Sequence, residues 1–76
     1  MASYQERMAT VLRYITDHLD EPLSLEDMAG KAHFSPYHFH RIFRGMMGES
    51  VMSFVRRLRL ERAAFRLSFS ARTILD

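Results

Sequence analysis

The chain has 76 residues, a net charge of +2 and no cysteine, which limits it to one small domain without disulfides or a cysteine-based zinc site. No apolar run approaches the roughly 20 residues of a membrane span, and the first residues do not form a secretory signal, so we expect a cytoplasmic protein. Residues 31–76 carry nine basic groups against three acidic ones, whereas residues 1–30 have a balance of −4. This asymmetry favours a polyanionic partner for the second half, although a solvated basic face gives the same pattern.

Two helices are predicted before residue 33. Apolar residues at helical spacing indicate a first helix that ends before Pro22, because the residue preceding a proline avoids the α region. These apolar residues are Met8, Val11, Leu12, Ile15 and Leu19. Ser24 and Asp27 then resemble a capping box, which predicts the start of a short second helix.

A third helix is predicted to begin at Ser35-Pro36 and to end at Gly48. Serine is a favoured N-cap, proline suits the first helical position, and glycine suits the left-handed residue after a helix. Only residues 32–34 separate the second and third helices. The two helices must therefore cross sharply, as in a helix-turn-helix.

A fourth helix is expected from about Val51 to Ser68, and Ser70 is expected to cap a fifth helix that the chain does not complete. The fourth helix has one apolar stripe of Val51, Phe54, Leu58 and Phe65, and a second of Leu60, Ala63 and Leu67. A surface helix of a finished domain needs one stripe, so two stripes predict a helix that bridges two packed bodies.

The predicted fold class is all-α, a small helix-turn-helix bundle of about four helices with a long linker helix and a truncated fifth helix. The expected divisions are a first helix-turn-helix unit at 4–50, a linker helix at 51–68 and the start of a truncated second unit at 69–76. The expected core contains Leu12, Ile15, Phe34, Phe39, Phe43, Phe54 and Leu58.

The third helix has two chemically distinct faces at about 100° of rotation per residue. One face carries Phe39, Ile42 and Phe43, and the other carries Tyr37, His40, Arg41 and Arg44. Arg41 can donate two hydrogen bonds to guanine, and His40 and Tyr37 can contact base edges or a thymine methyl group. Arg44 is better placed for phosphate. An amphipathic surface helix would look similar, but the preceding helix and turn favour DNA contact.

Three runs of sequence carry a resemblance to a known family: LSLEDMA at 23–29, FSPYHFHRIFR at 34–44 and LRLERA at 58–63. With Gly48 between them, they resemble the first helix-turn-helix unit and linker helix of the AraC/XylS family of bacterial transcription regulators. The resemblance covers about residues 6–76, and residues 70–76 resemble the opening of the family's second unit. Val51 stands where a proline is frequent in the family.

The resemblance implies sequence-specific DNA binding, with the third helix in the major groove of double-stranded DNA. Base contacts are then expected from Tyr37, His40 and Arg41, with Ser35 and Arg44 near the phosphates. The third-helix run is also similar to members with a GyrI-like effector-binding domain, so an effector is expected only through a domain absent here.

Other chemistry has little support in the sequence. His33, His38 and His40 lack the three- or four-residue spacing of helical metal ligands, so no metal or cofactor is expected. No nucleophilic set or Gly-rich phosphate loop is present, and we expect no enzymatic activity. The alternative function is a helix-turn-helix module for protein interaction or self-association, for which the second stripe of the fourth helix would provide a surface.

Overall fold

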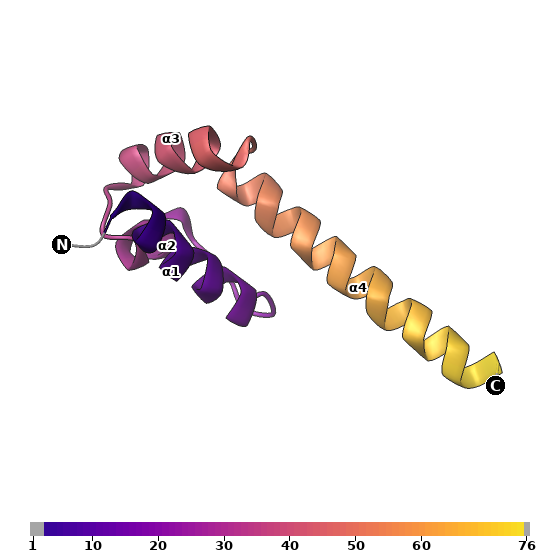
Figure 1. The fold of residues 1–76 in the computed structure, drawn as a ribbon. Helices are drawn as coiled ribbons and strands as arrows, with labels where there is room; N and C mark the ends of the chain where they lie inside the picture. The colour runs from indigo at the N-terminus through magenta and orange to yellow at the C-terminus, as the bar shows by residue number, and fades with distance from the viewer. Residues whose placement is uncertain (1–2, 76) are drawn as a thin grey trace.

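A computed structural model describes the backbone of residues 3–75 and the side chains of residues 3–67. It contains four helices, α1 (Tyr4–Asp17), α2 (Leu25–Lys31), α3 (Pro36–Met47) and α4 (Val51–Leu75), and no strand within the described backbone. Figure 1 shows α1 and α2 beneath α3, with α4 running away from the end of α3 as a long rod. The predicted all-α class with a helix-turn-helix bundle and a long linker helix is confirmed.

A serine hydroxyl caps the start of each of these helices. Ser24 Oγ accepts a hydrogen bond from the Asp27 N–H at 3.1 Å, and Ser35 Oγ accepts one from the His38 N–H at 3.2 Å. Ser3 and Ser50 make the equivalent bonds for α1 and α4. Each bond satisfies an N–H group that has no partner inside its own helix. The predicted starts of α2 and α3 are therefore confirmed.

The turn between α2 and α3 is a Schellman motif. The His33 N–H donates to the Gly30 carbonyl at 3.1 Å, and the Phe34 N–H donates to the Ala29 carbonyl at 2.9 Å. His33 has a φ of 59°, the only positive φ of a non-glycine residue in the described backbone. The chain thus reverses in three residues, and no glycine marks the left-handed position in the sequence.

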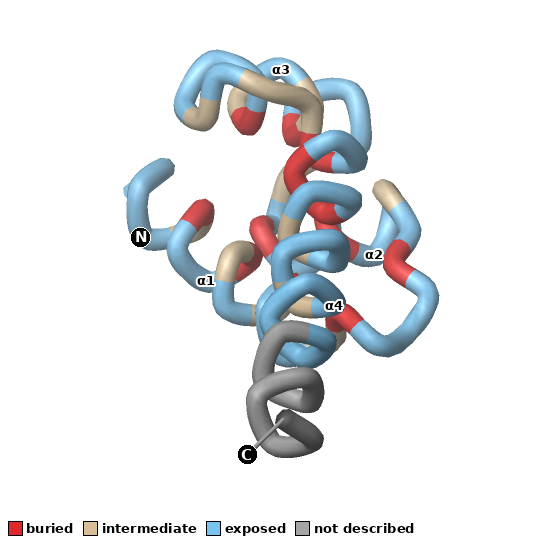
Figure 2. The backbone as a smooth tube through the Cα atoms, turned by 90° about the vertical axis from the view of Figure 1, so that its right-hand side faces the viewer, coloured by how far each residue is buried: buried red, intermediate tan, exposed pale blue. Residues whose placement is uncertain are grey.

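One apolar core joins the first three helices to the start of α4, as Figure 2 shows by burial. Ile15, Phe39, Phe43 and Phe54 are buried as predicted. Leu12, Phe34 and Leu58 were expected in the core but are only partly buried, because they lie at its edge. Val55 was not predicted, yet it is fully buried beside Val51 in the first turns of α4.

Beyond the core, the described large apolar side chains of α4 are exposed. Phe65 lies on the predicted first stripe, but it is 72% exposed, so this stripe is buried only at its start. Leu60 and Leu67 of the second stripe are also exposed. The described part of the chain contains no helix whose length and apolar character suit a membrane span.

The C-terminal part of α4 differs from the sequence prediction. The sequence predicts a break with a new cap at Ser70, whereas the helix continues through this position to Leu75. No glycine or proline lies between residues 66 and 75, and serine inside a helix costs only about 0.5 kcal/mol relative to alanine. The division between a linker at 51–68 and a second unit at 69–76 stays a prediction.

Candidate nucleic-acid interface

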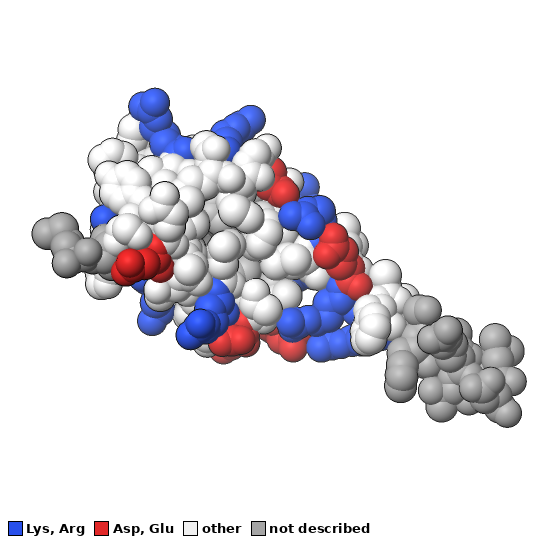
Figure 3. Space-filling model, viewed as in Figure 1, with Lys and Arg blue, Asp and Glu red and all other residues white. Residues whose placement is uncertain are grey.

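The outer face of α3 is polar and cationic, and its inner face is buried. Tyr37 is 70% exposed and Arg41 and Arg44 are exposed, whereas Phe39 and Phe43 are completely buried. Figure 3 shows Lys and Arg side chains projecting from the side of the molecule formed by α3. The division of α3 predicted from its rotation per residue is confirmed at these five positions, whereas His40 and Ile42 are only partly buried.

Tyr37 and Arg41 lie together on this face, one helical turn apart. The Arg41 Nη1 donates to the Tyr37 hydroxyl at 3.4 Å, and Arg41 Cζ lies 5.8 Å from the centre of the Tyr37 ring. The hydrogen bond is long and therefore weak. It holds the guanidinium beside the phenol and leaves most of its N–H donors available for the edge of a base.

The other residues expected at the site lie around this pair. His40 is half-buried, so only part of its ring reaches the outer face. Arg44 lies nearer the C-terminal end of α3, and Ser35 caps its start. The Ser35 oxygen accepts a bond from the His38 N–H, while its own O–H can still be donated to a phosphate oxygen.

Four arginines of α4 make hydrogen bonds or ion pairs within the protein that were not predicted from the sequence. Arg57 donates to Glu49 at 2.9 Å and to Glu61 at 3.1 Å. The hydrogen bond from Arg57 lowers the pKa of Glu49 below its ordinary value of 4.5. Figure 3 shows the result as alternating basic and acidic groups along α4.

Three further arginines tie α4 to α1 and to the segment that follows α1. Arg59 donates to the backbone carbonyls of residues 19 and 21, and Arg62 donates to the carbonyl of Thr16 at 3.2 Å. Arg62 and Arg66 also lie within 4.0 Å and 3.7 Å of the Asp20 carboxylate. The carboxylates of Glu49, Glu61 and Asp20 thus offset part of the positive charge of α4, so α3 provides the clearer argument for a polyanionic partner.

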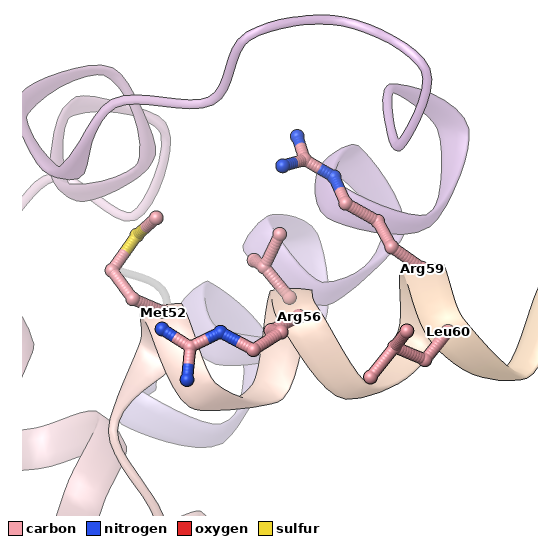
Figure 4. A pocket seen from close by; sticks show the side chains of 5 residues that line it. Met52, Arg56, Arg59 and Leu60 are labelled. Carbon is pink, nitrogen blue, oxygen red and sulfur yellow. The ribbon is translucent and has the colours of Figure 1, made fainter.

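A surface groove on α4 was not predicted from the sequence. It has a volume of about 320 Å³ and is lined by Met52, Val55, Arg56, Arg59 and Leu60. Figure 4 shows Arg59 extending from α4 toward the segment between α1 and α2, with Arg56 and Met52 nearer the start of the helix. The groove is open and offers an apolar strip beside a guanidinium, without a nucleophile or an acid–base pair.

Within the part of the chain that the structure describes, no three His, Cys, Asp or Glu side chains are grouped closely enough to hold a metal ion. His33 lies in the turn before α3, while His38 and His40 lie within α3.

Comparison with known proteins gives the same assignment as the fold. Residues 15–56 match the family model of bacterial regulatory helix-turn-helix proteins of the AraC family. This stretch contains α2, α3 and the first turns of α4.

Individual relatives agree. The chain is 39% identical over 66 residues to the right origin-binding protein of Escherichia coli K12, covering 87% of this chain and 23% of that protein. It is 38% identical over 66 residues to the TetD protein of transposon Tn10 from Escherichia coli, covering 87% of this chain and 48% of that protein. It is 31% identical over 74 residues to the regulatory protein SoxS of Salmonella typhimurium, covering 97% and 69%. The chain spans about a quarter of the first of these relatives. It belongs to the AraC family of bacterial regulatory helix-turn-helix proteins.

Proposed function

We propose that the chain binds double-stranded DNA sequence-specifically by placing α3 in the major groove, as part of a transcription regulator. The observation that carries the proposal is the exposure of Tyr37 and Arg41 side by side on a helix whose opposite face is locked in the core by Phe39 and Phe43. An α-helix about 10–12 Å wide fits a major groove that is about 12 Å wide.

Each side chain has a role that follows from its chemistry. Arg41 donates two hydrogen bonds to a guanine edge, Tyr37 packs on a sugar or a thymine methyl group, and His40 contacts a neighbouring base edge. Ser35 and Arg44 bind phosphate oxygens and set the register of α3 on the duplex. The name of the right origin-binding protein denotes binding at an origin, which accords with a DNA partner.

The length of α4 supports a linker role at 51–68. Residues 51–68 all lie within α4, and at 1.5 Å per residue they span about 27 Å, on the scale of the roughly 34 Å between successive major-groove segments on one side of the duplex. A second unit that begins at 69–76 would then reach the next groove. Effector binding by a further domain stays a prediction. Binding to the bacterial chromosome would place the protein in the cytoplasm. In this proposal the chain binds DNA and catalyses no reaction.

Self-association is the second candidate function, and it rests on a different surface. Leu60, Phe65 and Leu67 are large apolar side chains that are each at least 65% exposed on α4. Apolar surface of this kind is suited to contact with a second copy. The cationic face of α3 makes DNA the stronger candidate, because the centres of protein–protein interfaces are depleted of charge.

A salt titration separates the two functions. DNA duplexes enriched from a random pool by this chain are labelled, and binding is followed by fluorescence anisotropy at increasing salt. DNA binding should weaken linearly on logarithmic axes as counterions are released. Self-association, followed by light scattering, should respond little to salt. Absence of duplex binding even at low salt, together with dimer formation, would reverse the assignment.

A further inference from the structure

Arg7 of α1 contacts every residue of the turn between α2 and α3. Its Nε donates to the Ala32 carbonyl at 2.8 Å, and its Nη2 donates to the His33 carbonyl. Its guanidinium carbon lies 3.7 Å from the centre of the Phe34 ring, a cation–π distance. One forked side chain thus joins α1 to three consecutive residues that lie at least 25 positions away in sequence.

The turn that Arg7 contacts contains a residue in an unfavourable conformation. His33 occupies the left-handed position of the Schellman motif, which glycine usually fills. A side chain with a Cβ pays a steric cost at positive φ, so the surrounding structure must hold it there. The two carbonyls that Arg7 binds flank the φ and ψ angles of His33, so their common orientation toward one guanidinium depends on that conformation.

The contact extends to the start of α3 through an aromatic cluster. The Phe34 ring packs edge to face against Tyr4 at 5.3 Å and lies 6.4 Å from the ring of His38, in the first turn of α3. Arg7 covers Phe34 and also lies over the Tyr4 ring at 5.5 Å. The beginning of α3 is therefore held against the beginning of α1.

We propose that Arg7 is a positioning residue for DNA recognition, which fixes the left-handed turn at His33 and thereby the direction in which α3 presents Tyr37 and Arg41. The inference rests on the proposed function of α3. Base contacts require close alignment of donors and acceptors, whereas phosphate contacts tolerate small shifts. Loss of Arg7 should therefore reduce discrimination between DNA sequences more than it reduces general DNA affinity.

The first test compares Arg7→Ala with Arg13→Ala, which removes the same charge from an exposed position on the same helix. The probes are a duplex selected by the unmodified chain and a shuffled duplex of the same composition. Arg7→Ala should lower the preference for the selected duplex about tenfold, the effect of one misaligned base contact, and Arg13→Ala should leave the preference unchanged. Equal losses on both duplexes in both variants would mean that Arg7 acts as a general charge, and would overturn the proposal.

Two further variants test the geometry of the contact between Arg7 and the turn at residues 32–34. Arg7→Lys keeps the charge but not the planar fork, so it should lose most of the preference as well. It also replaces Arg7→Ala in the comparison if the alanine variant does not fold. His33→Gly in the Arg7→Ala background should restore the preference, because glycine adopts a positive φ without steric cost. A double variant with no recovery would show that Arg7 does not act through the turn at His33.

A measurement without DNA tests the turn separately. Backbone amide chemical shifts of residues 32–35, 37 and 38 should change in Arg7→Ala, while Arg13→Ala leaves them in place. In the variant that also carries His33→Gly, the shifts of residues 35, 37 and 38 should move back toward their original values. Unchanged turn amides in Arg7→Ala would overturn the proposal whether or not the chain binds DNA. Failure of the unmodified chain to select any duplex would instead overturn the proposed function and the recognition half of this inference, and the amide shifts would still decide whether Arg7 holds the turn.

Discussion

The ring of Phe43 on α3 packs edge to face against the ring of Phe54 on α4, with the ring centres 5.5 Å apart and the planes at 66°. Only residues 48–50 separate these two helices. The Phe43 ring is also 5.7 Å from the ring of Phe39, which is fully buried beneath α3. The proposed recognition helix and the start of α4 therefore pack against each other through these rings.

Phe43→Ala should destabilise the chain by about 3–5 kcal/mol, because it removes a fully buried ring and leaves a cavity. A core of this size supplies only about 3–5 kcal/mol in total, so the variant should be largely unfolded at room temperature. Urea denaturation followed by circular dichroism measures the change. Phe65→Ala is the matched control, since that ring is exposed, and it should change stability by less than about 0.5 kcal/mol. A Phe43→Ala variant that unfolds at the same urea concentration as the parent would mean that α3 is not docked as described.

Much of the fold could be predicted from the sequence because its signals are local. Ser24 and Ser35 mark helix starts through bonds from residues three positions away, Pro36 suits the first position of α3, and Gly48 ends α3 with a φ of 78°. The faces of α3 follow from helical periodicity alone. The continuation of α4 past Ser70 was not predicted, because serine is a good cap and also a tolerable interior residue.

Contacts between distant residues could not be predicted. Arg59 lies 40 and 38 residues from the two carbonyls that it binds, and nothing in its sequence neighbours distinguishes it from Arg56. The left-handed conformation of His33 could not be predicted, because this position is not a glycine. For the candidate site, the sequence identified the residues of the outer face of α3, but it gave no sign that Arg7 supports the turn before it.

Arg59→Ala should destabilise the chain by about 1–2 kcal/mol. The guanidinium donates to the Leu19 carbonyl at 3.0 Å and to the Glu21 carbonyl at 2.8 Å, and bonds from a charged donor contribute more than neutral ones. Both carbonyls can be rehydrated in the variant, which limits the loss. Thermal unfolding measures the effect, with Arg56→Ala as a control of the same charge on the same helix. Equal melting temperatures for the two variants would contradict an anchoring role for Arg59.

His33→Gly should stabilise the chain by about 0.5 kcal/mol. Replacing His33 with glycine removes a steric cost of about 1–2 kcal/mol for a Cβ at positive φ in the folded state. The greater flexibility of glycine in the unfolded chain offsets about 0.5–1 kcal/mol of this gain. His33→Ala keeps a Cβ at the same φ and should give no such gain. The urea midpoints of the two variants are compared, and a glycine variant less stable than the alanine variant would show that a Cβ at this φ carries no net steric cost.

The carboxyl of Glu49 should titrate below its ordinary pKa of 4.5, because Arg57 donates a hydrogen bond to it at 2.9 Å. A carboxyl whose pKa is lowered by folding stabilises the folded state above pH 4.5, and this contribution disappears as the pH falls through the lowered pKa. Arg57→Ala should return the pKa of Glu49 toward 4.5, as measured by the carboxyl carbon shift in an NMR titration. Arg56→Ala should leave that pKa unchanged, and an unchanged pKa in Arg57→Ala would contradict the assigned ion pair.

The assignment of α3 as the element that reads DNA is tested most directly by comparing Arg41→Ala and Arg44→Ala on the selected duplex and on its single-base variants. Arg41→Ala should cost about 1–3 kcal/mol on the selected duplex and relax the preference at one base pair. Arg44→Ala should weaken binding to every duplex by a similar factor and reduce the slope of affinity against salt by about 1. Arg13→Ala, exposed on α1, should bind as the parent does. If both α3 variants bound every duplex with the affinity and sequence preference of the parent, α3 would not be the recognition helix.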